Sequence, residues 1–318
     1  MMARVVAVLR SPWVRRGFVV LALAAAVWAV AVQWTEVREA AVRLGVGTLV
    51  VALLVGLVFV VLTMLSWRAV LTDMGSRLPV RSAASLFFVS QVAKYLPGGV
   101  WNILAAAEMG ADHAIPRRRS ISVMAVSLLV SVVTGSALAL AAIAIAPGEG
   151  AATYGWIGWT FPVFLLLLAP PVLNQVLSLA LRAVRRPPLE KPVSASGVAM
   201  SAGWSLLSWL TAGALVSLLA VPLGMEPGLA TYAIAAGGYA LAWTVGFLVL
   251  VVPAGVGVRE AVLAAVLATQ LTTGAVVLVV LLSRVLLTAA DLILGAVGLL
   301  LARRGVVNTE ETGSTAQP

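Results

Sequence analysis

The sequence predicts an all-α protein that crosses a membrane several times. Of its 318 residues, 62% are apolar and only 10% are charged, and the mean hydropathy is +1.08. A soluble domain is usually about half apolar and about a quarter charged. The apolar residues also form runs longer than the roughly 18 residues that mark a membrane span. We therefore expect about six transmembrane helices and two re-entrant helical hairpins of opposite orientation.

Six apolar runs are long enough to be spans. They cover residues 17–34, 44–67, 120–146, 156–181, 197–221 and 274–301. The first run has one alternative interpretation as a cleavable signal peptide, since Ala29-Val30-Ala31 has the small-x-small form of a cleavage site. In the fourth run, Pro170-Pro171 predicts a kink.

Two further apolar stretches, 82–112 and 229–271, are interrupted by Pro and Gly. The first is broken at Pro97-Gly98-Gly99, which leaves two arms of about 12 residues, or about 18 Å if helical. A hydrocarbon core is about 30 Å thick, so neither arm can cross it. Basic clusters flank this stretch on both sides, which places both of its ends at the same face. The second stretch is broken at residues 253–257. We expect each to be a re-entrant hairpin.

The distribution of Lys and Arg predicts the orientation. If the N-terminus lies inside, the basic clusters fall in cytoplasmic segments and only Arg38 and Arg43 fall in outer loops, as the positive-inside rule requires. The two hairpins then enter from opposite faces. Paired broken segments of opposite orientation indicate an inverted repeat with a binding site near the midplane. Two unrelated Pro/Gly kinks are the alternative.

The remaining composition excludes several kinds of site. The chain has no Cys and a single His, His113, which excludes disulfides, thiolate metal sites and multi-His metal sites. We therefore expect no metal, no cofactor and no catalytic group. The formal net charge of +9 is explained by topology rather than by a nucleic-acid partner, because the Arg residues form short clusters between apolar runs.

Two strings in the sequence resemble the signatures of one family. Residues 90–101 read Ser-Gln-Val-Ala-Lys-Tyr-Leu-Pro-Gly-Gly-Val-Trp, and residues 253–261 read Pro-Ala-Gly-Val-Gly-Val-Arg-Glu-Ala. They are similar to the two signatures of the lysylphosphatidylglycerol synthase transmembrane family, also called flippase-like proteins. Ala254 replaces a glycine of the usual second signature. The resemblance extends over about residues 15–303.

The resemblance implies a lipid-translocating membrane domain. Some relatives move aminoacylated phosphatidylglycerol, and others are linked to polyprenyl-phosphate sugar pathways. In the synthase members a soluble aminoacyl-transferase domain follows the membrane part. We expect residues 1–304 to form one transmembrane domain and 305–318 a short polar cytoplasmic tail, without synthase activity.

Residues around the two breaks are the candidate substrate-binding site. Glycine allows close approach to the backbone, half-helix N-termini attract anions, and ionisable side chains in a membrane usually face a partner or a wet cavity. The candidates are Lys94, Tyr95, Pro97, Gly98, Gly99, Trp101, Pro253, Gly255, Gly257, Arg259 and Glu260.

Three further ionisable residues, Glu108, Arg284 and Asp291, are predicted to form supporting ion pairs. Arg284 and Asp291 share a helix face but lie about 10 Å apart along it, so Arg284 is expected to pair elsewhere, for instance with Glu260. Structural alternatives exist for the other charges: Lys94 could snorkel to polar surroundings, and Arg259 could belong to a structural ion pair. Glu108 fits the cytoplasmic interface.

We expect a flippase or scramblase of a phosphate-bearing anionic lipid, such as a phosphatidylglycerol derivative or a polyprenyl-phosphate-linked sugar. The alternatives are a non-transporting scaffold in envelope lipid or glycan assembly, and a lipid-modifying membrane enzyme. The expected location is a bacterial plasma membrane, with both termini cytoplasmic. A second copy of the chain and envelope-biosynthesis enzymes are the protein partners left open.

Overall fold

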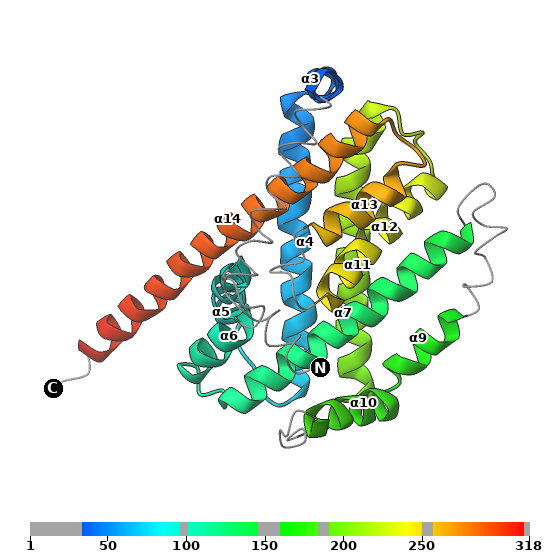
Figure 1. The fold of residues 1–318 in the computed structure, drawn as a ribbon. Helices are drawn as coiled ribbons and strands as arrows, with labels where there is room; N and C mark the ends of the chain where they lie inside the picture. Colours follow the sequence, from blue (N-terminus) through cyan, green and yellow to red (C-terminus); the bar gives the residue numbers. More distant parts are fainter. Residues whose placement is uncertain (1–33, 96–100, 146–159, 184–190, 250–256, 315–318) are drawn as a thin grey trace, which may run out of the picture.

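The protein is an assembly of α-helices in the computed structural model, which describes residues 34–95, 101–145, 160–183, 191–249 and 257–314 (Figure 1). No strand occurs in these ranges. The α-helices are α3 (Trp34–Arg43), α4 (Val46–Asp73), α5 (Val80–Val92), α6 (Trp101–Ala111), α7 (Arg117–Ile145), α9 (Phe161–Leu168), α10 (Pro170–Ala183), α11 (Ala195–Ala220), α12 (Leu229–Leu248), α13 (Val258–Leu267) and α14 (Thr273–Ser314). Two 3₁₀ turns, η1 (Ala93–Tyr95) and η3 (Val221–Leu223), follow α5 and α11.

Five of these helices are long and apolar enough to cross a membrane: α4, α7, α11, α12 and α14. Four of the five coincide with predicted spans. A sixth candidate is the pair α9 and α10, which is bent by 77°. The predicted kink lies there, because the residue before a proline is driven out of the helical region, and Ala169 has an extended ψ of 127°. The predicted first span, 17–34, falls almost wholly outside the described residues.

The two interrupted stretches differ from one another. In the first, α5 has 13 residues and α6 has 11, so both arms are short, as expected. In the second, α12 has 20 residues and qualifies as a span by itself. The first arm of the second stretch is therefore long enough to cross a membrane by itself, since its break comes late, near Pro253, and no charged residue interrupts residues 229–248. The re-entrant path of either stretch stays a prediction.

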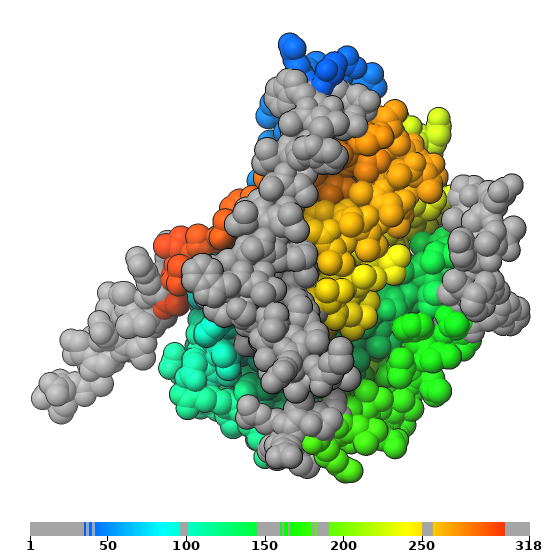
Figure 2. Space-filling model, viewed as in Figure 1, coloured from blue at the N-terminus to red at the C-terminus, as the bar shows by residue number. Residues whose placement is uncertain are grey.

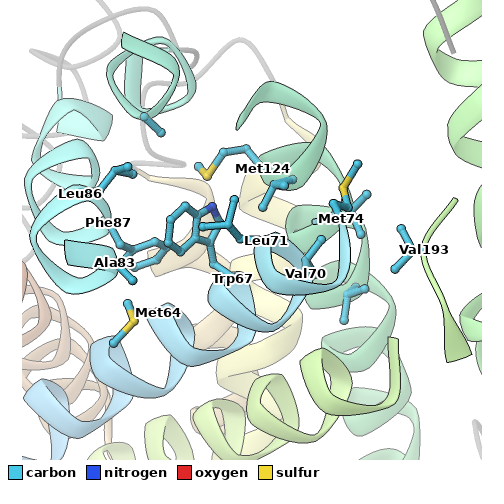
Figure 3. Close-up of a cluster of buried hydrophobic side chains, with 14 of the residues drawn as sticks. Met64, Trp67, Val70, Leu71, Met74, Ala83, Leu86, Phe87, Met124 and Val193 are labelled. Atoms are coloured by element: carbon cyan, nitrogen blue, oxygen red, sulfur yellow. The ribbon is translucent and has the colours of Figure 1, made fainter. Parts of the chain in front are cut away.

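Buried apolar side chains form two clusters, to both of which α4, α11 and α14 contribute. The first joins α4, α5, α6, α7 and the start of α11 around Trp67 (Figure 3), where the Trp67 and Phe87 ring centroids lie 5.4 Å apart. The second joins the start of α4 to the end of α11, α12, α13 and the start of α14. The outer faces of the spans carry exposed apolar side chains such as Leu54 and Val285, as lipid contact requires.

The same order of helix neighbours occurs twice. Helix α4 packs along α11, α5 packs against α14, and α12 packs against α7. Segments α4–α7 and α11–α14 therefore exchange contacts: the helix after the first long span of each lies against the last helix of the other. Figure 2 shows the yellow to orange helices α12 and α13 beside the green α7. This order is compatible with the predicted inverted repeat, which stays a prediction.

Small residues allow the helices to cross closely. A methyl group on Gly237 of α12 would overlap Ala142 of α7 and lie 3.3 Å from the backbone of Ala139. On α14, Gly298 accepts a hydrogen bond of 2.8 Å from Ser85 Oγ of α5. In lipid, where apolar side chains gain little from leaving the solvent, such close packing is a principal source of helix association.

The last helix is longer than its predicted span. Helix α14 has 42 residues and continues to Ser314, through most of the stretch 305–318 that the sequence suggests is a polar tail. A helix of this length extends about 63 Å, roughly twice the thickness of a hydrocarbon core.

Candidate functional site

A cavity of about 360 Å³ lies where the two interrupted stretches meet, and α4, α5, α6, α7, α12, α13 and α14 all contribute to its wall. Six of the predicted site residues line it together: Lys94, Tyr95, Arg259, Glu260, Arg284 and Asp291. They come from positions up to 197 residues apart in the chain. The packing of the two halves of the protein, α4–α7 and α11–α14, therefore brings these ionisable groups together in one cavity wall.

The residues before the first break are bound to the last helix. The 3₁₀ turn η1 closes α5 and carries Lys94 and Tyr95. The Lys94 ammonium lies 2.7 Å from Asp291 Oδ2, and the Tyr95 hydroxyl donates a 2.6 Å hydrogen bond to the same oxygen. Asp291 is buried, with its side chain 6% exposed, whereas Lys94 is 33% exposed. Lys94 is therefore a paired cation at the edge of the cavity.

The residues after the second break form a compact helix start. Gly257 has φ of 85°, in the region that favours glycine, and α13 begins at the next residue. Glu260 Oε2 accepts a 2.6 Å hydrogen bond from the Gly257 N–H, and Glu260 Oε1 lies 3.5 Å from Arg284 Nε. The predicted Arg284–Glu260 pair is present. The N–H of Gly257, one of the predicted substrate-binding residues, is occupied by Glu260.

Arg259 differs from the other cations of the cavity. Its guanidinium carbon lies 5.3 Å from the centre of the Trp243 ring, a cation–π contact, and Gly246 leaves room for its side chain. Its Nε is buried and has no hydrogen-bond partner. No carboxylate among the described residues pairs with it, and the neighbouring Glu260 is directed to Arg284. Among the described residues, Arg259 thus has no carboxylate partner within salt-bridge distance.

The ionisable groups of the wall carry a net positive charge. Lys94, Arg259 and Arg284 face two carboxylates, Glu260 and Asp291, and each carboxylate already has a cationic partner. Among the described residues no group of three His, Cys, Asp or Glu side chains could hold a metal ion. The cavity is therefore equipped to attract an anion.

Two predicted residues, Trp101 and Glu108, lie outside the described cavity wall. Trp101 is 44% exposed and is not among the residues of the cavity wall. Glu108 forms a surface pair with Arg117, whose Nη2 lies 2.6 Å from Glu108 Oε2. The hydrogen bond from Arg117 lowers the pKa of the Glu108 carboxyl below its ordinary value. Pro97, Gly98, Gly99, Pro253 and Gly255 lie outside the described residues.

Several wall residues were not foreseen from the sequence. Trp243 on α12, which stacks on Phe247 with centroids 5.4 Å apart, is 16 residues before the cation that it contacts. Trp67 on α4 and Ser127 on α7 also line the cavity. An indole or a hydroxyl in an apolar span is a weak signal, since such groups commonly serve helix packing.

The architecture is that of a helical, multi-pass membrane protein. Its helices enclose a cavity whose described charged side chains are three cations and two carboxylates. The family model for the lysylphosphatidylglycerol synthase TM region matches residues 17–295, and the chain belongs to this family. Family membership associates the chain with membrane lipid or envelope biology. No curated protein matches the sequence.

Proposed function

We propose that the protein moves a phosphate-bearing anionic lipid between the two leaflets of a bacterial plasma membrane. The observation that carries this proposal is the uncompensated Arg259 in a cavity formed by both halves of the chain. A charged side chain at membrane depth costs about 2.5–3.5 kcal/mol on insertion scales. A protein keeps such a charge where the charge serves a function, and an anionic ligand would compensate the charge of Arg259.

Phosphate is the anion that fits this arrangement. The planar guanidinium of an arginine can bind two phosphate oxygens at once, which the compact ammonium of a lysine cannot do. The Trp243 ring contacts the Arg259 guanidinium, so a packing contact rather than an ion pair with a carboxylate orients the guanidinium. The acyl or prenyl chains of the lipid would remain in the bilayer while the headgroup enters the cavity.

Movement across the membrane would come from the two halves of the chain. The exchanged contacts of α5 with α14 and of α12 with α7 would allow one half to rock against the other, so that the cavity faces each leaflet in turn. The sequence contains no P-loop motif, so the lipid gradient, an ion gradient or the membrane potential would supply any drive. The lipid would leave chemically unchanged.

The positive-inside distribution of Arg supports an orientation with both termini in the cytoplasm. Membrane lipids are the proposed partners. A second copy of the chain and enzymes of envelope biosynthesis are partners that the proposal accommodates but does not need.

The test is a proteoliposome assay that follows labelled phosphatidylglycerol, its aminoacylated form and a polyprenyl phosphate between leaflets. Arg259→Gln should slow the movement of the transported lipid by roughly 10- to 100-fold, since hydrogen bonds to charged groups contribute about 1.5–3 kcal/mol. Arg259→Lys, which keeps the charge but loses the planar fork, should fall in between. Arg117→Gln is the matched control, because Arg117 is exposed and lies in the surface pair with Glu108.

Two outcomes would contradict the proposal. One is wild-type protein that moves none of these lipids with or without an imposed proton gradient, which would favour the scaffold interpretation. The other is an Arg259→Gln variant that moves lipid at the wild-type rate. A new lipid product after incubation would instead favour an enzyme.

A further inference from the structure

The cavity wall contains few groups that could exchange a coupling ion. A transporter that moves a proton together with its substrate needs a side chain that takes up and releases that proton, usually a carboxylate or a histidine. The chain has 12 acidic residues and one His, and among the described residues of the wall only Glu260 and Asp291 are of these types. By sequence, the two breaks (96–100 and 250–256) and the predicted first span (17–34) add no acidic residue or His. Ion exchange at the cavity would therefore depend on these two carboxylates.

Both carboxylates are already paired with cations. Asp291 Oδ2 lies 2.7 Å from the Lys94 ammonium and accepts a 2.6 Å hydrogen bond from the Tyr95 hydroxyl. Glu260 Oε1 lies 3.5 Å from Arg284 Nε, and its other oxygen accepts from the N–H that precedes α13. Protonation of either carboxylate would break an ion pair in an apolar interior, which is costly. Neither group is therefore suited to carry a proton across with the substrate.

The charged groups of the described wall leave one positive charge in excess. Three cations, Lys94, Arg259 and Arg284, face the two carboxylates, so the net charge is +1. This value is the same wherever the proton shared by Lys94 and Asp291 lies within their pair. A lipid phosphate with a single negative charge would make the occupied cavity neutral. Neutrality lowers the cost of moving the bound group through a region of low dielectric.

We infer that the protein is an electrogenic uniporter of its anionic lipid, which moves without a coupling ion and is driven by the membrane potential. A plasma membrane is negative inside, so the potential pushes a lipid anion toward the outer leaflet. The occupied cavity crosses as a neutral unit, and the empty cavity returns with its positive charge. This inference rests on the proposed function for the movement of lipid, but the pairing of both carboxylates supports it separately.

The first experiment measures how a charged lipid distributes under a potential. Proteoliposomes of phosphatidylcholine contain traces of labelled phosphatidylglycerol or of a labelled polyprenyl-phosphate-linked sugar, each with one negative charge. Valinomycin and a K⁺ gradient of about tenfold, high inside, make the lumen negative. The labelled lipid should become about tenfold enriched in the outer leaflet, because it and K⁺ are both singly charged and distribute over the same potential. This ratio is independent of the direction in which the protein is inserted.

A pH gradient is the matched condition. With equal K⁺ on both sides and valinomycin present, the potential is zero, and an imposed pH gradient should leave the labelled lipid evenly distributed. A proton-coupled carrier would instead accumulate the lipid on one side.

The second experiment separates the occupied from the empty step. When unlabelled phosphatidylglycerol is abundant in both leaflets, labelled lipid exchanges through the occupied cavity alone, and wild-type exchange should be unaffected by the potential. Arg259→Gln removes one positive charge from the wall, which makes the occupied cavity negative. Its exchange, although slower, should become several-fold faster out of a negative lumen. Arg117→Gln is the control, since Arg117 is exposed and paired with Glu108 at the surface, and it should exchange as wild type does.

Two results would overturn the inference while lipid movement itself remains. One is an even distribution of the moved lipid despite the potential. The other is accumulation that follows the pH gradient at zero potential, which would assign proton exchange to one of the two carboxylates; loss of that accumulation in Asp291→Asn or Glu260→Gln would identify it. Wild-type exchange that changes steeply with potential would overturn the neutral occupied cavity. If neither labelled lipid moves under any gradient, the proposed transport itself fails.

Discussion

The two halves of the molecule place a basic residue next to a helix break, but they treat its charge in opposite ways. Lys94, just before the first break, is bound to Asp291 of the other half. Arg259, just after the second break, lies on Trp243 and has no carboxylate partner among the described residues. The pairing of Lys94 with Asp291 therefore helps to hold the two halves together, whereas Arg259 contributes a cation without a carboxylate partner to the described part of the cavity wall. This difference predicts stability changes of opposite sign.

The largest effect is expected at the first break. Asp291→Asn keeps the shape of the side chain but leaves Lys94 without its counter-ion. Breaking a buried pair costs about 3–5 kcal/mol, and because Lys94 is one-third exposed we expect about 2 kcal/mol of destabilisation. Thermal unfolding in detergent measures it. The double variant Lys94→Met with Asp291→Leu should recover most of the loss, and an Asn variant as stable as wild type would show that the pair does not hold the halves.

The next largest effects on stability are expected where α12 crosses α7 and where α14 crosses α5. Gly237→Ala on α12 would press on Ala142 and on the α7 backbone, and we expect about 1–2 kcal/mol of destabilisation after the helix gains its usual benefit from Ala. Gly295→Ala on α14 meets a methyl group of Val92 at 2.5 Å, but the nearest α5 backbone atom lies 3.7 Å away. Because a β-branched valine is stiff in a helix, this variant should also destabilise the protein, though by less than Gly237→Ala. Equal unfolding midpoints for the two variants would mean that the crossings are equally tolerant.

A smaller effect, of opposite sign, is expected at the second break. Arg259→Met removes an uncompensated charge and should stabilise the protein by about 1 kcal/mol, since the loss of the Trp243 contact offsets part of the gain. Lipid movement should be lost in the same variant. If Arg259→Met destabilised the protein by as much as is expected for Asp291→Asn, Arg259 would instead belong to a structural ion pair.

The smallest effect is expected at the exposed Glu108–Arg117 pair. Because the folded state lowers the pKa of Glu108, its contribution is present above the ordinary carboxyl pKa and is lost as the pH falls through the folded value. Unfolding of wild type and Glu108→Gln, measured between neutral and acidic pH, should converge as the pH falls. A difference that grows on acidification would contradict this sign.

Local sequence features predicted much of this arrangement, and pairings between distant segments were the part that they could not supply. Apolar runs identified four of the five described candidate spans, and four of the residues predicted beside the Pro-Gly breaks line the cavity. The Arg284–Glu260 pair was predictable because both residues belong to neighbouring segments. The contact of Lys94 with Asp291 depends on how α5 crosses α14, and this is set by packing. Residues 229–271 were predicted as one interrupted hairpin because of the break at Pro253, whereas α12 is long enough to be a span by itself.

The length of α14 has a practical consequence. This helix carries Arg284 and Asp291 in the cavity wall and continues as one helix to Ser314, so a small tilt about the cavity becomes a large displacement at its far end. The sequence contains no cysteine. A single cysteine introduced near residue 312 would therefore be the sole thiol in the chain, and a spin label or fluorophore attached there would report any tilt of α14 during the proposed transport.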